Sequence, residues 1–121
     1  MTNSMKFLEA LGFKCFAATA SSYCYDADNL VICIGKREDS YRVSCYSIDK
    51  YTSVEFNDIK TEEDVMDTIF DYVYIKNKAL IETNIKRLPL YYQEVLLREW
   101  CEANGKDIRD DKSLKEFVEL F

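Results

Sequence analysis

The sequence predicts an α+β fold: a short N-terminal helix, an antiparallel meander of three or four strands, and then three helices, at least one of them packed on the sheet. Aromatic and β-branched segments separated by short polar turns fill the first half, and such short turns connect antiparallel strands. In the second half, apolar residues recur at helical spacing. The 121 residues include only three glycines and one proline, which leaves no flexible linker. Residues 1–121 are therefore expected to form a single domain.

Residues 1–12 are expected to form the first helix. Asn3 or Ser4 can cap its start, because both side chains accept hydrogen bonds from backbone N–H groups. Gly12 is expected to end the helix in the left-handed conformation and to bring Phe13 back over it. The apolar face comprises Phe7, Leu8 and Leu11.

Residues 13–56 are expected to form the sheet. The predicted strands cover residues 13–25, 30–35, 40–48 and, as an edge strand, 52–56. The second of these is the continuous apolar run LVICIG, which is typical of a central strand buried on both faces. The third alternates instead, and it places Arg42 and Tyr46 on the opposite face from Val43. If that face lies away from the helices, Arg42 and Tyr46 form an exposed patch and a second binding candidate.

Residues 61–121 are expected to form the helical half. The predicted helices begin at Thr61, Pro89 and Ser113. The first extends at least to Asn77, and an end near Thr83 remains open. Proline suits the first position of a helix, and Ser113 precedes Glu116 by the spacing of a capping box.

Several kinds of catalytic and metal chemistry find no support in the residue types. The chain has no histidine, which removes catalytic triads and metal sites that depend on imidazole. Its three glycines lie far apart, so no phosphate-binding loop is present. We therefore predict no catalytic residue, no cofactor and no metal ligand.

The five cysteines lack the C-x₂₋₄-C spacing of small zinc sites. Cys33 and Cys45, and Cys15 in a similar way, are interpreted as small buried apolar side chains. Cys24, between two tyrosines and beside a turn, is expected to be partly exposed. The N-terminus shows no export signal and no apolar window is long enough for a membrane span, so we expect a cytoplasmic protein with cysteine thiols.

The acidic charge of the chain is concentrated in one region. The net charge is −6, and residues 49–75 carry eight acids against two lysines. Part of this charge lies on one side of the helix predicted from Thr61. We identify the following candidate partner-binding residues: Asp58, Glu62, Glu63, Asp64, Asp67, Asp71 and Tyr74. They can form either a solvated helix face or a surface that docks on a basic protein. Direct binding to nucleic acid is not expected of so acidic a chain.

In size, acidity and helix–meander–helix order the chain resembles small proteins that phages and mobile elements use against host nucleases, including anti-CRISPR proteins. It equally resembles cytoplasmic immunity proteins. The resemblance covers the general style of the whole chain and includes no motif. It implies a non-catalytic inhibitor that occludes the nucleic-acid-binding surface of a basic partner. The alternatives are an immunity protein that neutralises a toxin, a small histidine-free cysteine or carboxylate enzyme, and a structural or self-associating subunit.

Overall fold

The computed structural model describes residues 2–120 and confirms the α+β fold, with five strands where three or four were predicted. The strands are β1 (Lys14–Ala18), β2 (Ser22–Ala27), β3 (Leu30–Lys36), β4 (Tyr41–Ser47) and β5 (Thr52–Ile59). The helices are α1 (Asn3–Ala10), α2 (Glu62–Lys76), α3 (Lys78–Thr83), α4 (Leu90–Asn104) and α5 (Asp111–Leu120), with a 3₁₀ turn, η1, at Ile85–Arg87. None of the helices within these residues is long and apolar enough to cross a membrane.

The additional strand arises because the segment predicted as one strand, residues 13–25, folds back on itself. A tight turn at residues 19–21 separates β1 from β2. The Thr19 N–H donates to the Ser22 carbonyl at 2.7 Å, and the Thr19 hydroxyl accepts the Ser22 N–H at 3.1 Å. The turn contains no Gly, Pro, Asn or Asp, so the usual turn signals are missing from it.

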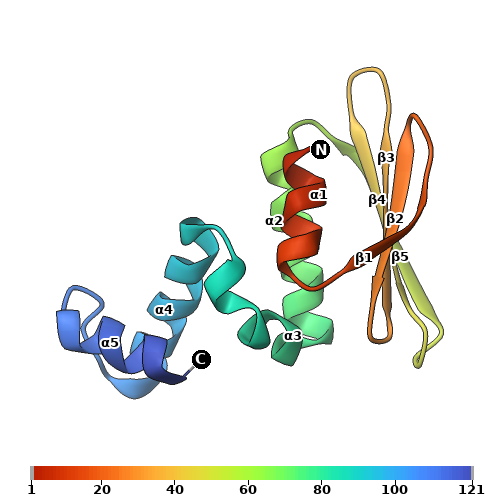
Figure 1. Cartoon of the computed structure of the whole chain (residues 1–121). Helices are drawn as coiled ribbons and strands as arrows, with labels where there is room; N and C mark the ends of the chain where they lie inside the picture. The colour runs from red at the N-terminus through yellow and green to blue at the C-terminus, as the bar shows by residue number, and fades with distance from the viewer. Residues whose placement is uncertain (1, 121) are drawn as a thin grey trace.

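The five strands form one antiparallel meander in the order β1-β2-β3-β4-β5. Only one face of this sheet is covered by helices, which lie together on one side of it (Figure 1). In the central strand β3, Ile32 and Ile34 are fully buried, whereas Val31 and Cys33 are half-buried. The prediction that this strand is buried on both faces is therefore wrong, because the second helical layer it requires does not exist among the described residues.

Helices α1 and α2 lie side by side over the covered face of the sheet (Figure 1). α2 contacts β4 and β5 and buries Val65, Ile69 and Val73 completely. Gly12 ends α1 at φ +94°, as predicted, and the Phe13 N–H donates to the Leu8 carbonyl at 2.9 Å. This backbone bond satisfies a terminal carbonyl and turns the chain into β1.

The helix boundaries differ from the predictions at four points, one of which is Pro89, the N-cap residue of α4 rather than its first helical residue. Thr2, rather than Asn3 or Ser4, caps α1 by accepting the Met5 N–H. α2 ends at Lys76 because Asn77 leaves the helical conformation and its side chain caps α3. α5 begins two residues before Ser113 and is capped by Asp110, whose carboxylate accepts the Lys112 N–H at 3.0 Å.

Helices α4 and α5 form an arm on the side of α1 and α2 that is remote from the sheet (Figure 1). Tyr92 of α4 joins this arm to the rest of the molecule. Its ring centroid lies 4.8 Å from that of Phe7 in α1 and 4.8 Å from that of Phe70 in α2. Within the arm, Trp100 packs against Phe117 with ring centroids 5.9 Å apart.

Candidate functional site

Four carboxylates, here called the acidic face of α2, line the side of this helix opposite its buried residues: Glu63, Asp64, Asp67 and Asp71. Three of the four are exposed and Asp67 is half-buried. Thr61 fixes the start of the helix by accepting the Asp64 N–H at 3.1 Å. The helix dipole favours acids in this first turn, but the effect fades before Asp67 and Asp71 are reached.

No ion pair compensates the acidic face of α2 within the part of the chain that the structure describes. Asp67 and Asp71 are four residues apart, a spacing at which like charges destabilise a helix by about 0.2–0.5 kcal/mol. The pKa of Asp71 is raised above the ordinary value of an aspartate, first by partial burial and second by the charge of Asp67. The repulsion between Asp67 and Asp71 therefore lowers the stability of α2.

Two acids of the predicted binding set make contacts inside the molecule. Asp67 accepts a hydrogen bond from the Tyr92 hydroxyl at 2.7 Å and so connects α2 to the arm. Burial, together with this bond, raises the pKa of the Tyr92 hydroxyl. Glu62 is half-buried and accepts a hydrogen bond from the Ser4 hydroxyl at 3.3 Å. Both carboxylates thus hold neighbouring helices together.

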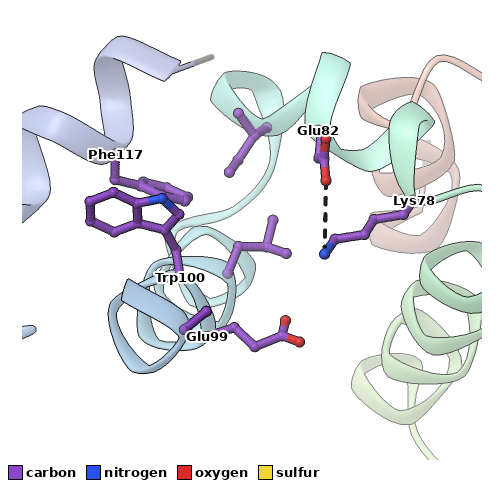
Figure 2. A pocket seen from close by; sticks show the side chains of 8 residues that line it. Lys78, Glu82, Glu99, Trp100 and Phe117 are labelled. Atoms are coloured by element: carbon purple, nitrogen blue, oxygen red, sulfur yellow. Dashed lines mark ion pairs between the residues drawn. The ribbon is translucent and has the colours of Figure 1, made fainter. Parts of the chain in front are cut away.

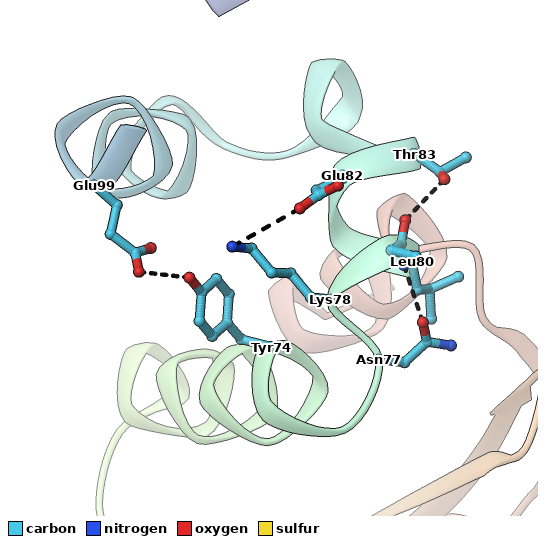
Figure 3. Close-up of polar contacts among 8 residues, drawn as sticks. Tyr74, Asn77, Lys78, Leu80, Glu82, Thr83 and Glu99 are labelled. Atoms are coloured by element: carbon cyan, nitrogen blue, oxygen red, sulfur yellow. Dashed lines mark hydrogen bonds and ion pairs between the residues drawn. The ribbon is translucent and has the colours of Figure 1, made fainter. Parts of the chain in front are cut away.

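Tyr74 is turned toward Glu99 of α4 (Figure 3). Its ring stacks on Phe70 with centroids 6.1 Å apart, and its hydroxyl donates to Glu99 Oε1 at 2.5 Å. Burial and the bond to Glu99 raise the pKa of Tyr74. The Lys78 Nζ lies 5.2 Å from the ring centroid, in cation–π geometry. Tyr74 is therefore part of the connection between α2, α3 and α4.

The accessible part of the predicted set comprises Asp58, Glu63, Asp64 and Asp71. Their carboxylates make no hydrogen bond or ion pair with another described residue, although Asp71 is influenced by Asp67. Asp58 lies at the end of β5 with φ +57°, a conformation that aspartate tolerates better than most residues. It follows that the surface open to a partner is narrower than the sequence predicted.

A small pocket opens between α3, α4 and α5. Its volume is about 180 Å³. Leu96, Trp100 and Phe117 supply apolar walls. Figure 2 shows Trp100 and Phe117 on one side of this pocket and the charged groups of Lys78 and Glu82 on the other. Sites for cofactors and drug-sized ligands measure about 300–1,000 Å³, so this pocket suits a single inserted side chain better.

The rim of the pocket is polar and forms one connected set of contacts (Figure 3). Glu99 receives the Tyr74 hydroxyl, and the Lys78 Nζ lies 3.9 Å from Glu82 Oε1. The two carboxylates and one ammonium leave a net negative rim. Sequence reasoning missed Lys78, Glu82 and Glu99, because the break of the helix at Asn77 that brings them together has no strong sequence signal. Two spacings of four residues, from Tyr74 to Lys78 and from Lys78 to Glu82, are the sequence patterns that point to contacts here.

The face of the sheet that is not covered by helices carries the second predicted patch. The strand register places Arg42, Ser44 and Tyr46 on this face, as the alternation predicted. Arg42 Nη1 forms an ion pair with Glu55 Oε1 at 3.1 Å, and Tyr46 is exposed. The patch is therefore polar and internally paired, unlike the acidic face of α2.

The cysteines occupy different environments from those predicted in two cases. Cys45 is buried and Cys24 half-buried, as expected, but Cys15 is exposed and Cys33 is only half-buried. Cys15 lies on an edge strand and Cys33 on the uncovered face, which explains both errors. Burial raises the pKa of Cys45 to about 12, and burial together with the Cys24 thiol raises that of Cys33 to about 12. Neither thiol is activated as a nucleophile.

No cluster of three or more acidic, cysteine or histidine side chains among residues 2–120 is arranged to hold a metal ion. Comparison with known proteins adds no further guide to function. No known family model, curated protein or solved structure matches this chain. The assignment therefore rests on the geometry of the acidic face of α2 and its surroundings.

Proposed function

We propose that the protein is a small, non-catalytic binding protein whose acidic face of α2 docks on a basic protein, and that this partner handles nucleic acid. The observation that carries the proposal is the uncompensated, exposed row of Glu63, Asp64 and Asp71, extended by Asp58. A partner that supplies lysines and arginines would remove the repulsion that α2 bears alone. Folding stability does not account for Asp71, because this residue lies beyond the first turn that the helix dipole favours and is repelled by Asp67.

Docking of this kind would inhibit the partner, because the acidic face of α2 and the nucleic acid compete for the same lysine and arginine side chains. Residues three or four apart on a helix lie about 5–6 Å from each other, so the acidic face of α2 presents closely spaced negative charges on a rigid support. Lysine and arginine side chains that otherwise hold phosphates can bind these carboxylates instead. Such electrostatics mainly accelerate association and select the partner, and they weaken as salt screens the charges.

The experiment is an affinity purification of the tagged protein from its native host, followed by mass spectrometry. The test variant carries Glu63→Lys, Asp64→Lys and Asp71→Lys. Asp67 is left unchanged because its bond to Tyr92 supports the fold. The matched control carries the same change in charge on other exposed acids, namely Glu38→Lys, Asp39→Lys and Glu102→Lys.

We expect the wild type and the control to retain a stoichiometric basic partner, and the test variant to lose it. Binding should also weaken at least tenfold when the salt concentration is raised across the physiological range. Retention of the partner by a correctly folded test variant would contradict the proposal. A toxin as the retained partner would make the protein an immunity protein that uses the same surface.

A structural or self-associating role is the second candidate, and the arm favours it. Leu90 is 79% exposed and Tyr91 61% exposed on α4, while Leu114 and Val118 are 48% and 45% exposed on α5. Apolar side chains of this size are commonly covered when proteins associate. Light scattering of the purified chain distinguishes the two roles, since the first requires a monomer that binds another protein and the second a stable oligomer.

A further inference from the structure

Two cysteines face each other across neighbouring strands on the uncovered face of the sheet. Cys24 in β2 and Cys33 in β3 are direct partners in the antiparallel register. The residues that flank them in the sequence, Tyr25, Ile32 and Ile34, are buried toward the helices. Since side chains alternate along a strand, both thiols point to the opposite, uncovered side. β2 and β3 lie next to each other in the centre of Figure 1's sheet.

The hydrogen-bond pattern of this hairpin shows how closely the two residues approach. The Lys36 N–H donates to the Ser21 carbonyl at 2.7 Å, so Ser21 and Lys36 form a hydrogen-bonded pair. Hydrogen-bonded and non-hydrogen-bonded pairs alternate along antiparallel strands. Cys24 and Cys33 lie three pairs further along the same register, and they are therefore a non-hydrogen-bonded pair. The Cα atoms of such a pair are about 4.5 Å apart, with the side chains close together.

This separation is compatible with a disulfide. Disulfides join cysteines whose Cα atoms are about 4.4–6.8 Å apart, a range that includes the separation of a non-hydrogen-bonded pair such as Cys24 and Cys33. All five cysteines are thiols in the structure. The remaining three are poorly placed for this pairing: Cys45 faces the helices, Cys101 is buried in the arm, and Cys15 lies opposite Tyr25.

We propose that Cys24 and Cys33 are a dithiol site that low-molecular-weight disulfides, such as glutathione disulfide, oxidise to a cross-strand disulfide. The Cys24 thiolate attacks one sulfur of glutathione disulfide, forms a mixed disulfide and expels one glutathione. The Cys33 thiolate then attacks the Cys24 sulfur and expels the second glutathione. Each released glutathione thiolate takes up a proton given up by a cysteine. The two cysteines are oxidised and the glutathione disulfide is reduced.

The order of the two steps follows from the surroundings of the two thiols. Burial and the neighbouring Cys24 raise the pKa of Cys33 to about 12, which makes Cys33 a poor first nucleophile. On its other side Cys24 faces Ala17 of β1, a small residue on the edge strand, so a reagent can approach it. Cys33 is flanked instead by Cys24 and by Ser44. Its proximity to the Cys24 sulfur compensates for its high pKa in the second, intramolecular step.

The experiment treats the folded, full-length protein with glutathione disulfide and then counts free thiols under denaturing conditions. The count is expected to fall from five to three, with the loss of two hydrogen atoms in the intact mass. Cys24→Ser and Cys33→Ser should each abolish the intramolecular bond. The matched control, Cys15→Ser, changes an exposed thiol on the adjacent strand and should form the bond as the wild type does.

Peptide mapping must separate three cysteines that lie on one tryptic peptide, residues 15–36. Chymotrypsin cleaves after Tyr23 and Tyr25 and places each of them on a different fragment. The expected linked fragments contain Cys24 and Cys33. A bond that includes Cys15, or a glutathione that stays on Cys24 in the presence of Cys33, would overturn the proposal. So would five intact thiols under conditions that oxidise a short dithiol peptide used as a reference.

Discussion

The body of the molecule (residues 2–83) and its arm (residues 90–120) are built in different ways. In the body, α2 packs against β4 and β5 of the sheet. The largest fully buried side chains, from Phe7 to Ile81, all belong to this region. In the arm, two helices pack on each other through Trp100 and Phe117. Among the described residues, six of the twelve exposed large hydrophobic side chains lie in the arm.

This difference indicates that the body and the arm differ in local stability. A core of completely buried side chains resists local opening, whereas a region with few of them opens at lower free energy. The arm is held to the body by the Tyr92 ring, by its hydrogen bond to Asp67 and by the bond between Tyr74 and Glu99. We therefore expect the arm to open before the body. Ile32→Ala and Phe117→Ala test this comparison, and Asp71→Asn tests the acidic face of α2 within the body.

Ile32→Ala is expected to have the largest effect. Ile32 is fully buried in the central strand, and its truncation leaves a cavity that strand pairing prevents from closing. We expect the free energy of unfolding to fall by about 3–4 kcal/mol. Urea denaturation followed by far-ultraviolet circular dichroism measures it. A loss below about 1 kcal/mol would show that the body core is not the main source of stability.

Phe117→Ala is expected to have a smaller effect that is confined to the arm. Phe117 is 5% exposed and contacts Trp100, the one tryptophan of the chain. Because the arm can partly collapse around the missing ring, we expect a loss of about 2 kcal/mol.

Tryptophan fluorescence reports on the arm and circular dichroism at the β-sheet wavelengths on the body. The fluorescence midpoint of Phe117→Ala should shift to lower urea by more than the sheet midpoint, while Ile32→Ala should shift both. Coincident shifts in the Phe117→Ala variant would show instead that the body and the arm unfold as one cooperative unit.

Asp71→Asn is expected to have the smallest effect, and its sign depends on pH. The pKa of Asp71 is raised in the folded protein, so the fold favours the protonated form. The resulting stability is present below the unfolded-state pKa of about 3.9 and is lost as the pH rises through the folded-state value. At neutral pH the ionised group costs stability, and Asn removes its repulsion with Asp67. We expect a gain of about 0.2–0.5 kcal/mol at pH 7.

Urea denaturation at pH 7 and at pH 3.5 measures the difference in free energy of unfolding between Asp71→Asn and the wild type. This difference should be smaller at pH 3.5. Glu38→Gln serves as the control, since Glu38 is an exposed carboxylate in a turn of the sheet and should change little. A destabilised Asp71→Asn variant at neutral pH would contradict the view of the acidic face of α2 as a cost to the helix.

Local patterns in the sequence predicted most of the body. Gly12 and the alternation around Val43 each depend on residues within a few positions, and the structure confirms both. The turn at residues 19–21 was missed because its stabilising contacts come from threonine and serine, which are weak turn signals. The burial of Cys15 and Cys33 was misjudged because it depends on which strand is an edge and which face is covered.

The sequence by itself determined the α+β class, the order of the elements and the acidic face of α2, because the periodicity and sign of side chains need only local geometry. The tertiary structure decided which of those acids are available. It directed Asp67 and Tyr74 to Tyr92 and Glu99 of α4, and it left Glu63, Asp64 and Asp71 open. It also aligned Cys24 with Cys33. The contacts with α4 depend on the packing of elements that are separate in the sequence, and no short stretch of sequence encodes them.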